Sequence, residues 1–251
     1  MKLHRHPLAA ALFAVVLAST APAAGNAQTF SSEQRGEIER IIKEYLLSNP
    51  ELLQDVMTEL EKHQTAADAE KHRAAVAENK ATLFSSPHQV VLGNPQGNVT
   101  MVEFFDYNCG YCKRAMSDML DLIKTDNNLK FVLKEFPVLG EGSVEAARVA
   151  VAARMQDSTG KKYIEFHQKL LGGRGADKAR ALAVAKEVGF DMPRLERDMG
   201  SDEVKKTIDE NMKLAEALGV NGTPSYVVGQ EVVVGAVGLD ALREKISAER
   251  K

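Results

Sequence analysis

Residues 104–116 read FFDYNCGYCKRAM and hold Cys109 and Cys112, the only two cysteines in the chain. They follow the apolar run Thr100–Phe105, which is typical of a buried strand. The residues after them, as far as Ile123, have the apolar spacing of a helix. Cys109 is therefore expected near a helix N-terminus, where unpaired amides and the helix dipole favour a thiolate. Cys112, three residues on, lies within reach of Cys109.

Three interpretations compete with a redox couple for this pair. A structural disulfide that closes so short a loop removes little chain entropy. A zinc site wants four ligands, but there is no second cysteine pair and the six histidines lack ligand spacing. A cysteine hydrolase needs a histidine base, and His167 in FHQKLL is more simply a surface or interhelix residue. The pattern favours thiol-disulfide exchange, in which Cys109 attacks and Cys112 resolves the mixed disulfide.

Two charged residues interrupt apolar strands near the cysteines. Glu103 lies in Met101–Phe105, where a carboxylate is costly unless it is paired or used. We expect it to accept the proton of Cys112 when that thiol attacks. Lys134 interrupts the next strand and is a candidate charge partner for Glu103. The alternative places both side chains in water at sheet edges.

Composition and the first residues indicate an exported globular protein. The chain is 44% apolar and 27% charged with a net charge of -3. It therefore lacks the excess positive charge that is typical of proteins that bind nucleic acid. Residues 1–27 have a basic start, the apolar run Leu8–Ala18 and then small residues, so they predict a secretory signal peptide. Cleavage is expected after Ala27, with Ala23 or Ala24 as alternatives. The apolar run is about 11 residues long and a membrane-spanning helix needs roughly 20, so we expect a soluble protein in a bacterial periplasm.

Residues 28–84 are helical in pattern. A first helix is expected after a cap at Ser31 or Ser32, and a second is expected from Pro50. Both carry apolar stripes that nothing in the segment covers, which predicts a stalk that forms a homo-oligomer, a dimer or trimer; the alternative is packing on the following domain. A chain that lacks Phe30–Phe84 is expected to remain a folded, redox-active monomer.

Residues 85–251 predict a single α/β domain. Strands are expected at 90–92, 100–105, 130–136, 225–228 and 231–234, with a helical insertion at about 140–218 and a closing helix at 239–248. Pro224, in the turn Gly222–Tyr226, comes at the mouth of a strand. The residues alone favour a trans bond there, because cis bonds are only about 5–6% of X-Pro bonds.

Several separated motifs resemble the thioredoxin superfamily, and specifically the DsbA-like periplasmic disulfide oxidoreductases, over about Pro87–Lys251. They are EFFDYNCGYCKRAM, KEFPVLGEGSVEAARVA, VNGTPSYVVG and the closing helix, in that order. The resemblance implies a thioredoxin fold with an inserted helical domain, preceded by the N-terminal helical stalk. It implies a cis bond at Pro224, with Thr223 and Pro224 facing the cysteines and contacting the substrate. It also places Glu103 at the family's buried acidic position.

The residues around the cysteines resemble those of one functional branch. Gly110-Tyr111 replaces the Pro-His of the strong oxidant, and Thr223 replaces its valine, both as in periplasmic disulfide isomerases. The N-terminal helices resemble the stalk of ScsC-type (suppressor of copper sensitivity) and Com1-like members, some of which oligomerise. The resemblance implies an isomerase or reductase for secreted cysteine-containing proteins, kept reduced by a membrane redox partner. A DsbA-type oxidase and a secreted chaperone or copper(I)-binding protein are the alternatives. No bound cofactor is expected, because the disulfide carries the electrons.

Overall fold

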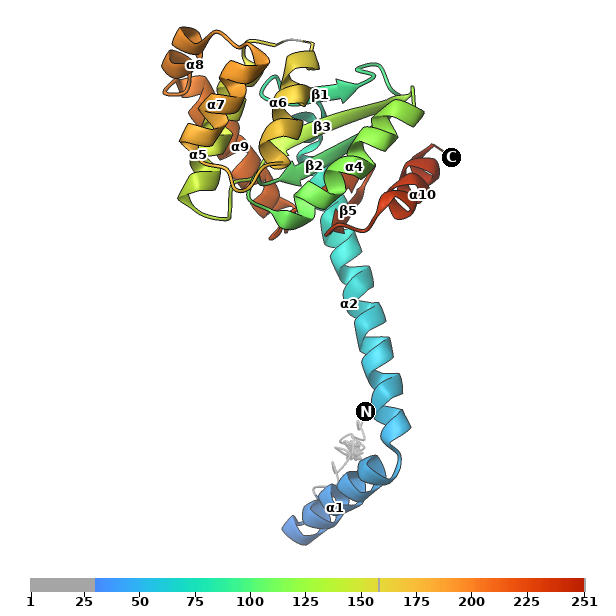
Figure 1. Cartoon of the computed structure of the whole chain (residues 1–251). Coiled ribbons are helices and arrows are strands. Elements are labelled where there is room, and N and C mark those ends of the chain that lie inside the picture. Colours follow the sequence, from blue (N-terminus) through green and yellow to red (C-terminus); the bar gives the residue numbers. More distant parts are fainter. Residues whose placement is uncertain (1–29, 158, 251) are drawn as a thin grey trace, which may run out of the picture. The chain divides into compact units, whose positions relative to one another are not determined.

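A computed structural model describes residues 30–157 and 159–250, and a five-stranded mixed sheet forms its centre (Figure 1). The strands are β1 (Val90–Gly93), β2 (Val99–Phe105), β3 (Leu129–Glu135), β4 (Ser225–Val228) and β5 (Glu231–Val234). Their order is β1-β3-β2-β4-β5, in which β2 and β3 are parallel and the other pairs are antiparallel. β2 and β3 are almost fully buried, which explains their nearly continuous apolar sequences. The sheet predicted from the sequence is confirmed.

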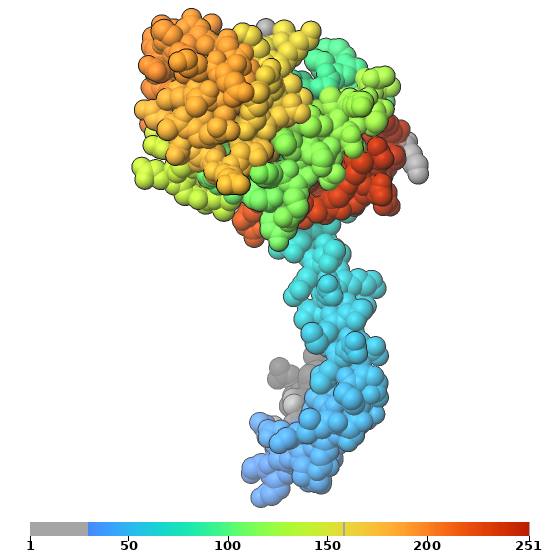
Figure 2. Space-filling model, in the orientation of Figure 1, coloured from blue at the N-terminus to red at the C-terminus, as the bar shows by residue number. Residues whose placement is uncertain are grey.

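Helices cover both faces of this sheet. The helices that follow β1 are α4 (Gly110–Thr125), α5 (Glu141–Arg154), α6 (Lys161–Leu171), α7 (Lys178–Val188), α8 (Met192–Asp198), α9 (Asp202–Ala217) and α10 (Leu239–Glu249). One core cluster joins the sheet to α4, α10 and the inserted helices α5 to α8. The other contains residues of β2, β3 and α9. Figure 2 shows α4 in green beside the yellow and orange helices of the insertion, which α4 contacts through α6.

A chain of buried polar side chains ties the insertion to the sheet. The Tyr163 hydroxyl donates to Glu135 Oε1 at 2.7 Å and lies 3.2 Å from the Tyr107 hydroxyl. His167 Nδ1 lies 3.3 Å from the same Tyr107 hydroxyl, and burial lowers the pKa of His167 to about 3. His167 is therefore a neutral residue buried between α6 and β2, and not the surface or interhelix histidine that its sequence context predicted. It has no hydrogen bond to Cys109.

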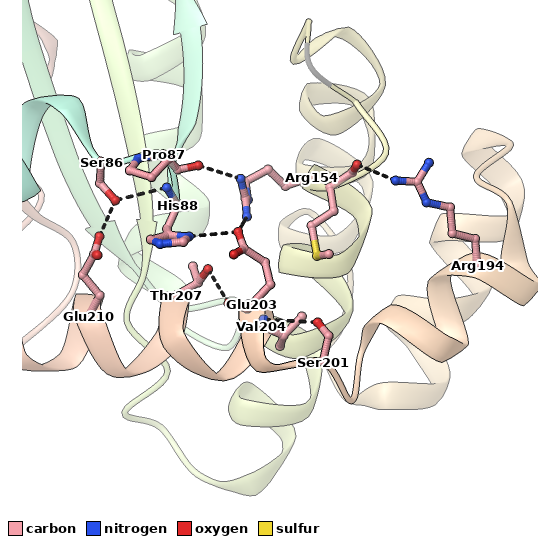
Figure 3. A network of polar contacts seen from close by, with 11 residues as sticks. Ser86, Pro87, His88, Arg154, Arg194, Ser201, Glu203, Val204, Thr207 and Glu210 are labelled. Atoms are coloured by element: carbon pink, nitrogen blue, oxygen red, sulfur yellow. Dashed lines mark hydrogen bonds and ion pairs between the residues drawn. The ribbon is translucent and has the colours of Figure 1, made fainter.

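A second polar network fixes the segment before β1 to α5 and α9 (Figure 3). Glu203 Oε1 lies 2.9 Å from His88 Nδ1 and 2.6 Å from Arg154 Nη2. Arg154 also donates to the carbonyl of Pro87 at 3.0 Å, and Ser86 donates to Glu210. The last helix of the insertion is thereby held to the start of the sheet.

The N-terminal helices are α1 (Ser32–Ser48) and α2 (Pro50–Glu78), and the chain divides into two compact units after Thr58. Ser31 caps α1 through a capping box with Gln34, as predicted. No residue of α1 is buried. Large apolar side chains are exposed on both helices at Ile38, Ile41, Ile42, Tyr45, Leu47, Leu53, Val56, Met57 and Leu60. The predicted signal peptide, residues 1–27, lies outside the described residues.

The second unit begins at Glu59, earlier than the start of the α/β domain that the sequence predicted at residue 85. Val76 of α2 and Leu83 of α3 (Lys80–Ser85) are buried in the same cluster as residues of β2, β3 and α9. Lys130 and Lys134 of β3 donate to the carbonyls of Phe84 and Thr82 at 2.7 and 3.0 Å, which holds the C-terminal turn of α3 on the sheet. A deletion through Phe84 would remove these core residues, so the expectation that it leaves an intact domain is not supported.

Across residues 30–157 and 159–250, no helix has both the length and the apolar character needed to cross a membrane.

Candidate active site

Cys109 is the N-cap residue of α4, directly after the buried strand β2 and a short loop. Its Sγ accepts a hydrogen bond from the backbone N–H of Cys112 at 3.4 Å. An N-cap position is where backbone donors are unpaired and negative charge is stabilised. Cys109 is 6% exposed and Cys112 is fully buried, so Cys109 is the sulfur that a partner can reach first. This geometry supports the predicted roles of attacking and resolving thiol.

The loop before β4 lies against the attacking sulfur. Cys109 Sγ donates to the carbonyl of Thr223 at 3.1 Å, although the two residues are far apart in the sequence. The Thr223-Pro224 peptide bond is cis, as the resemblance implied. Ser225 Oγ donates to the carbonyl of Gly222 at 2.8 Å and closes this turn. Thr223 and Pro224 therefore face the cysteine pair.

Glu103 lies on the central strand β2, with β3 on one side and β4 on the other, and is 3% exposed. Burial raises the pKa of its carboxyl from 4.5 to about 8, and the nearby Cys109 and Asp118 add to the rise. Burial also raises the pKa of the Cys112 thiol, and the negative charge of Glu103 is the next largest cause. The Glu103 carboxyl thus lies close enough to the buried thiol to affect its ionisation, as a base must.

Lys134 is not the charge partner of Glu103, and this interpretation of the sequence is wrong. The parallel register places Lys134 beside Phe104, the neighbour of Glu103 on β2, so the two charged side chains point to opposite faces of the sheet. Lys134 instead donates to Thr82, and burial lowers its pKa to about 8. The alternative, in which both side chains lie in water at sheet edges, is wrong as well, because both are buried.

We call the rim of the site the exposed residues of the first turns of α4 together with the loop that follows β3, because hydrogen bonds to Asp106 join that loop to the segment that leads into Cys109. Tyr111 is 59% exposed, and the guanidinium carbon of Arg114 lies 4.2 Å from its ring centroid. A Cβ added at Gly110 would meet no atom within 4 Å, so Gly110 borders open space. Val138 and Leu139 are also exposed.

Two polar residues that sequence reasoning missed lie in the loop between β2 and α4. Asp106 is buried and accepts hydrogen bonds from three backbone amides, and Asn108 bonds to Ser143 and to the backbone of Ala176. The Asp-x-Asn spacing of an Asx turn was the available signal, but the partners 30 or more residues away were not readable. In residues 30–157 and 159–250, no group of three or more His, Cys, Asp or Glu side chains is placed to hold a metal ion.

Comparison with known proteins agrees with this geometry. A family model described as DSBA-like thioredoxin domain matches residues 100–247, and one described as copper resistance protein ScsC N-terminal domain matches residues 34–67. A thioredoxin-like oxidoreductase from Silicibacter pomeroyi DSS-3 is 47% identical with a TM-score of 0.65, and the match covers 68% of this chain and 98% of that one. ScsC of Proteus mirabilis in a transitional conformation is 25% identical with a TM-score of 0.64, over 88% of this chain and 97% of that one.

Among curated proteins, disulfide bond formation protein D of Bacillus subtilis is 27% identical over 179 residues, which are 65% of this chain and 78% of that protein. A Na(+)/H(+) antiporter NhaA of Salinispora arenicola also matches, at 26% identity over 161 residues, 63% of this chain. The chain spans only 24% of the antiporter's length. With a family match over more than half of its length and a cysteine pair at the start of α4, the chain belongs to the DSBA-like thioredoxin domain family of thiol-disulfide oxidoreductases.

Proposed function

We propose that the protein is a periplasmic thiol-disulfide oxidoreductase that isomerises or reduces disulfides of secreted proteins. The observation that carries the proposal is the position of Cys109: its sulfur caps α4, touches the Thr223 carbonyl and lies three residues before the buried Cys112. The N-cap position supports a reactive thiolate, and the buried second thiol supports intramolecular resolution. Gly110 and Tyr111 follow Cys109 directly and the Thr223 carbonyl bonds to its sulfur, which supports their assignment to substrate binding, together with Pro224.

In the first step the Cys109 thiolate attacks one sulfur of a client disulfide. A bond forms between Cys109 and that sulfur, and the other client sulfur leaves as a thiolate. In reduction, Cys112 then gives its proton to the Glu103 carboxylate and attacks Cys109. This forms the Cys109–Cys112 disulfide and releases the second client thiolate, so two electrons pass from the pair to the client. In isomerisation, another client thiol displaces Cys109 and no net oxidation occurs.

The direction of electron flow rests on the residues around the couple. Gly110-Tyr111 and Thr223 resemble those of isomerases, which favours a pair kept reduced by a membrane redox partner. An oxidase of DsbA type, reoxidised by a quinone-linked membrane protein, is the alternative. The reduction potential against glutathione separates them: a value near about -120 mV indicates a strong oxidant, while about -180 mV or below agrees with isomerase or reductase activity.

We propose that this chemistry takes place in the periplasm, to which the protein is exported. The basic and apolar pattern of residues 1–27 supports a cleaved signal peptide. Protein recovered from the periplasmic fraction is expected to begin at Gln28, which N-terminal sequencing checks. A chain that keeps Met1 and stays with the cytoplasmic fraction would contradict this part of the proposal.

The activity is tested by substituting each cysteine. Cys109→Ala is expected to abolish insulin reduction and the refolding of scrambled ribonuclease, because the remaining thiol, Cys112, is fully buried. Cys112→Ala is expected to abolish net reduction but to keep part of the refolding activity, since isomerisation needs only the attacking thiol. Full activity of Cys109→Ala in both assays would sink the proposal.

A second candidate function is binding of copper(I), and the match of residues 34–67 to the N-terminal domain of a copper resistance protein favours it. Two thiolates three residues apart suit a soft monovalent ion. Titration with Cu(I) against a competing chelator is expected to show binding that the double variant Cys109→Ala/Cys112→Ala loses. The copper candidate displaces the redox proposal only if the wild-type protein binds copper and lacks exchange activity.

A further inference from the structure

The carboxylate of Asp106 holds together two segments at the rim of the active site. Its Oδ2 accepts hydrogen bonds from the backbone N–H groups of Val138 and Leu139, both at 2.9 Å. Its Oδ1 accepts the N–H of Asn108 at 2.8 Å, and its backbone carbonyl accepts the N–H of Cys109 at 3.0 Å. Asp106 is 2% exposed. One buried residue thus contacts both the backbone that leads into the attacking cysteine and the loop after β3.

The loop after β3 depends on this carboxylate. Within the described residues, the amides of Val138 and Leu139 have no other hydrogen-bond acceptor. Their side chains are nevertheless 40% and 53% exposed. The loop is therefore held through its backbone by Asp106, which lies three residues before Cys109, and it presents two exposed apolar side chains.

Asn108 makes a similar connection on the other side of the loop. Its Nδ2 donates to Ser143 Oγ and to the carbonyl of Ala176, both at 2.9 Å, and its Oδ1 accepts the Ala176 N–H at 2.7 Å. The segment that contains Cys109 is thus joined by side-chain bonds to α5 and to the loop before α7. Asp106 differs from Asn108 in that its partners carry exposed apolar side chains.

We propose that Asp106 is a positioning residue for protein clients: it fixes Val138 and Leu139 beside Cys109, where they contact the apolar chain that flanks the client's cysteine. The inference rests on the proposed exchange function and adds a residue that acts without touching the reacting sulfurs of the client. A protein client must be held while its disulfide is aligned with Cys109, and a loose contact surface lowers the fraction of productive encounters. A small disulfide needs only the sulfur itself. Loss of the Asp106 carboxylate should therefore affect protein clients more than small disulfides.

The test compares Asp106→Ala with the wild-type full-length chain on two substrates, an unfolded protein disulfide and glutathione disulfide. Alanine removes both acceptor oxygens, so the amides of Val138 and Leu139 lose their acceptor. KM for the protein substrate is expected to rise about fivefold to tenfold more than KM for glutathione disulfide, with a smaller change in kcat. Asp126→Ala is the matched control, because Asp126 Oδ1 accepts the N–H of Asn128 in the same Asx pattern at the far end of α4. It should change neither KM.

Hydrogen exchange in the wild-type protein tests the hydrogen bonds between Asp106 and the loop after β3, and this test does not depend on whether the variant folds. The amides of Val138 and Leu139 are expected to be protected although their side chains are exposed. Asp106→Ala should release both, while the Phe136 amide, bonded to the Phe105 carbonyl, stays protected. Leu139→Ala keeps the carboxylate bonds and should also raise KM for the protein substrate selectively. Unprotected amides in the wild type, or equal effects of Asp106→Ala on both substrates, would overturn the inference. A wild-type protein that is inactive on both substrates would instead refute the exchange function itself.

Discussion

At the scale of single residues, the site combines a reactive thiol with a buried carboxyl that the fold stabilises poorly. Glu103 was predicted as a functional carboxylate because it interrupts an apolar strand, and the structure places it in the middle of the sheet. Its supposed partner Lys134 was mispredicted for a definite reason. Strand register decides which face each side chain takes, and the pairing of Phe104 with Lys134 cannot be read from either strand alone.

Glu103 should make the stability of the protein depend on pH. Its pKa is about 8 when folded and 4.5 ordinarily, so between these values the folded chain keeps a proton that the unfolded chain releases. The contribution of the Glu103 carboxyl to the stability of the folded protein is fully present below pH 4.5, falls as the pH rises and is lost above about pH 8. The free energy of unfolding of the wild type, measured relative to that of Glu103→Gln, should therefore fall by several kcal/mol across this pH range, at about 1.4 kcal/mol per pKa unit. Denaturant unfolding of both proteins at pH 5 and pH 9 measures the difference. Parallel pH profiles would contradict the raised pKa.

Glu103 should also control the speed of resolution. In Glu103→Gln the Cys112 thiol loses its internal base, so the mixed disulfide is expected to resolve about tenfold to a hundredfold more slowly at pH 7. Quenched-flow trapping of the adduct with a cysteine peptide disulfide measures this step. Glu135→Gln is the matched control: Glu135 is also a buried carboxyl in a strand, but it bonds to Tyr163 of the insertion. An equal slowing in both variants would argue against a specific role for Glu103.

At the scale of elements, the sequence predicted the five strands closely because their apolar runs and turn residues are strong signals. It did not assign the end of α2 and α3 to the catalytic unit. That stretch is rich in alanine, and few large side chains, among them Val76 and Leu83, face the core, so its pattern resembles that of a solvent-exposed helix. The polar chain from Glu135 to His167 was also unpredictable, since it joins side chains from three segments.

Tyr163→Phe tests how the insertion is fixed to the sheet. The change removes a hydroxyl that bonds to Glu135 and Tyr107 and leaves a buried carboxyl without its donor. The free energy of unfolding is expected to fall by about 1–3 kcal/mol. Tyr45→Phe is the control, because Tyr45 is 58% exposed, and it should have no effect. Equal stabilities of the two variants in chemical denaturation would show that the hydrogen bonds of the Tyr163 hydroxyl contribute nothing to the free energy of unfolding.

At the scale of the whole molecule, the exposed apolar side chains of α1 and α2 support the proposal that copies of the chain associate. Nine large apolar side chains between Ile38 and Leu60 are exposed, in the region that matches an ScsC N-terminal domain. The sequence predicted these stripes but could not give the number of copies, because it contains no sustained heptads. Several active sites in one particle would allow different parts of a misfolded client to be engaged together.

The double variant Leu53→Lys/Met57→Lys tests this association in the full chain. Lysine at two exposed apolar positions should prevent burial between copies and give a monomer in light scattering, where the wild type gives a dimer or trimer. Gln54→Lys places one lysine at an exposed polar position of the same helix and should leave the mass unchanged. A monomeric wild-type protein would remove the proposed role of these helices.

The most direct test of the central claim is to trap the mixed disulfide and identify its sulfur. Cys112→Ser, mixed with a protein that carries one disulfide, should accumulate a covalent adduct that mass spectrometry assigns to Cys109. Cys109→Ser should form little or none, because its remaining thiol is fully buried. Adduct formation through Cys112, or no adduct in either variant, would contradict a mechanism in which Cys109 attacks and Cys112 resolves.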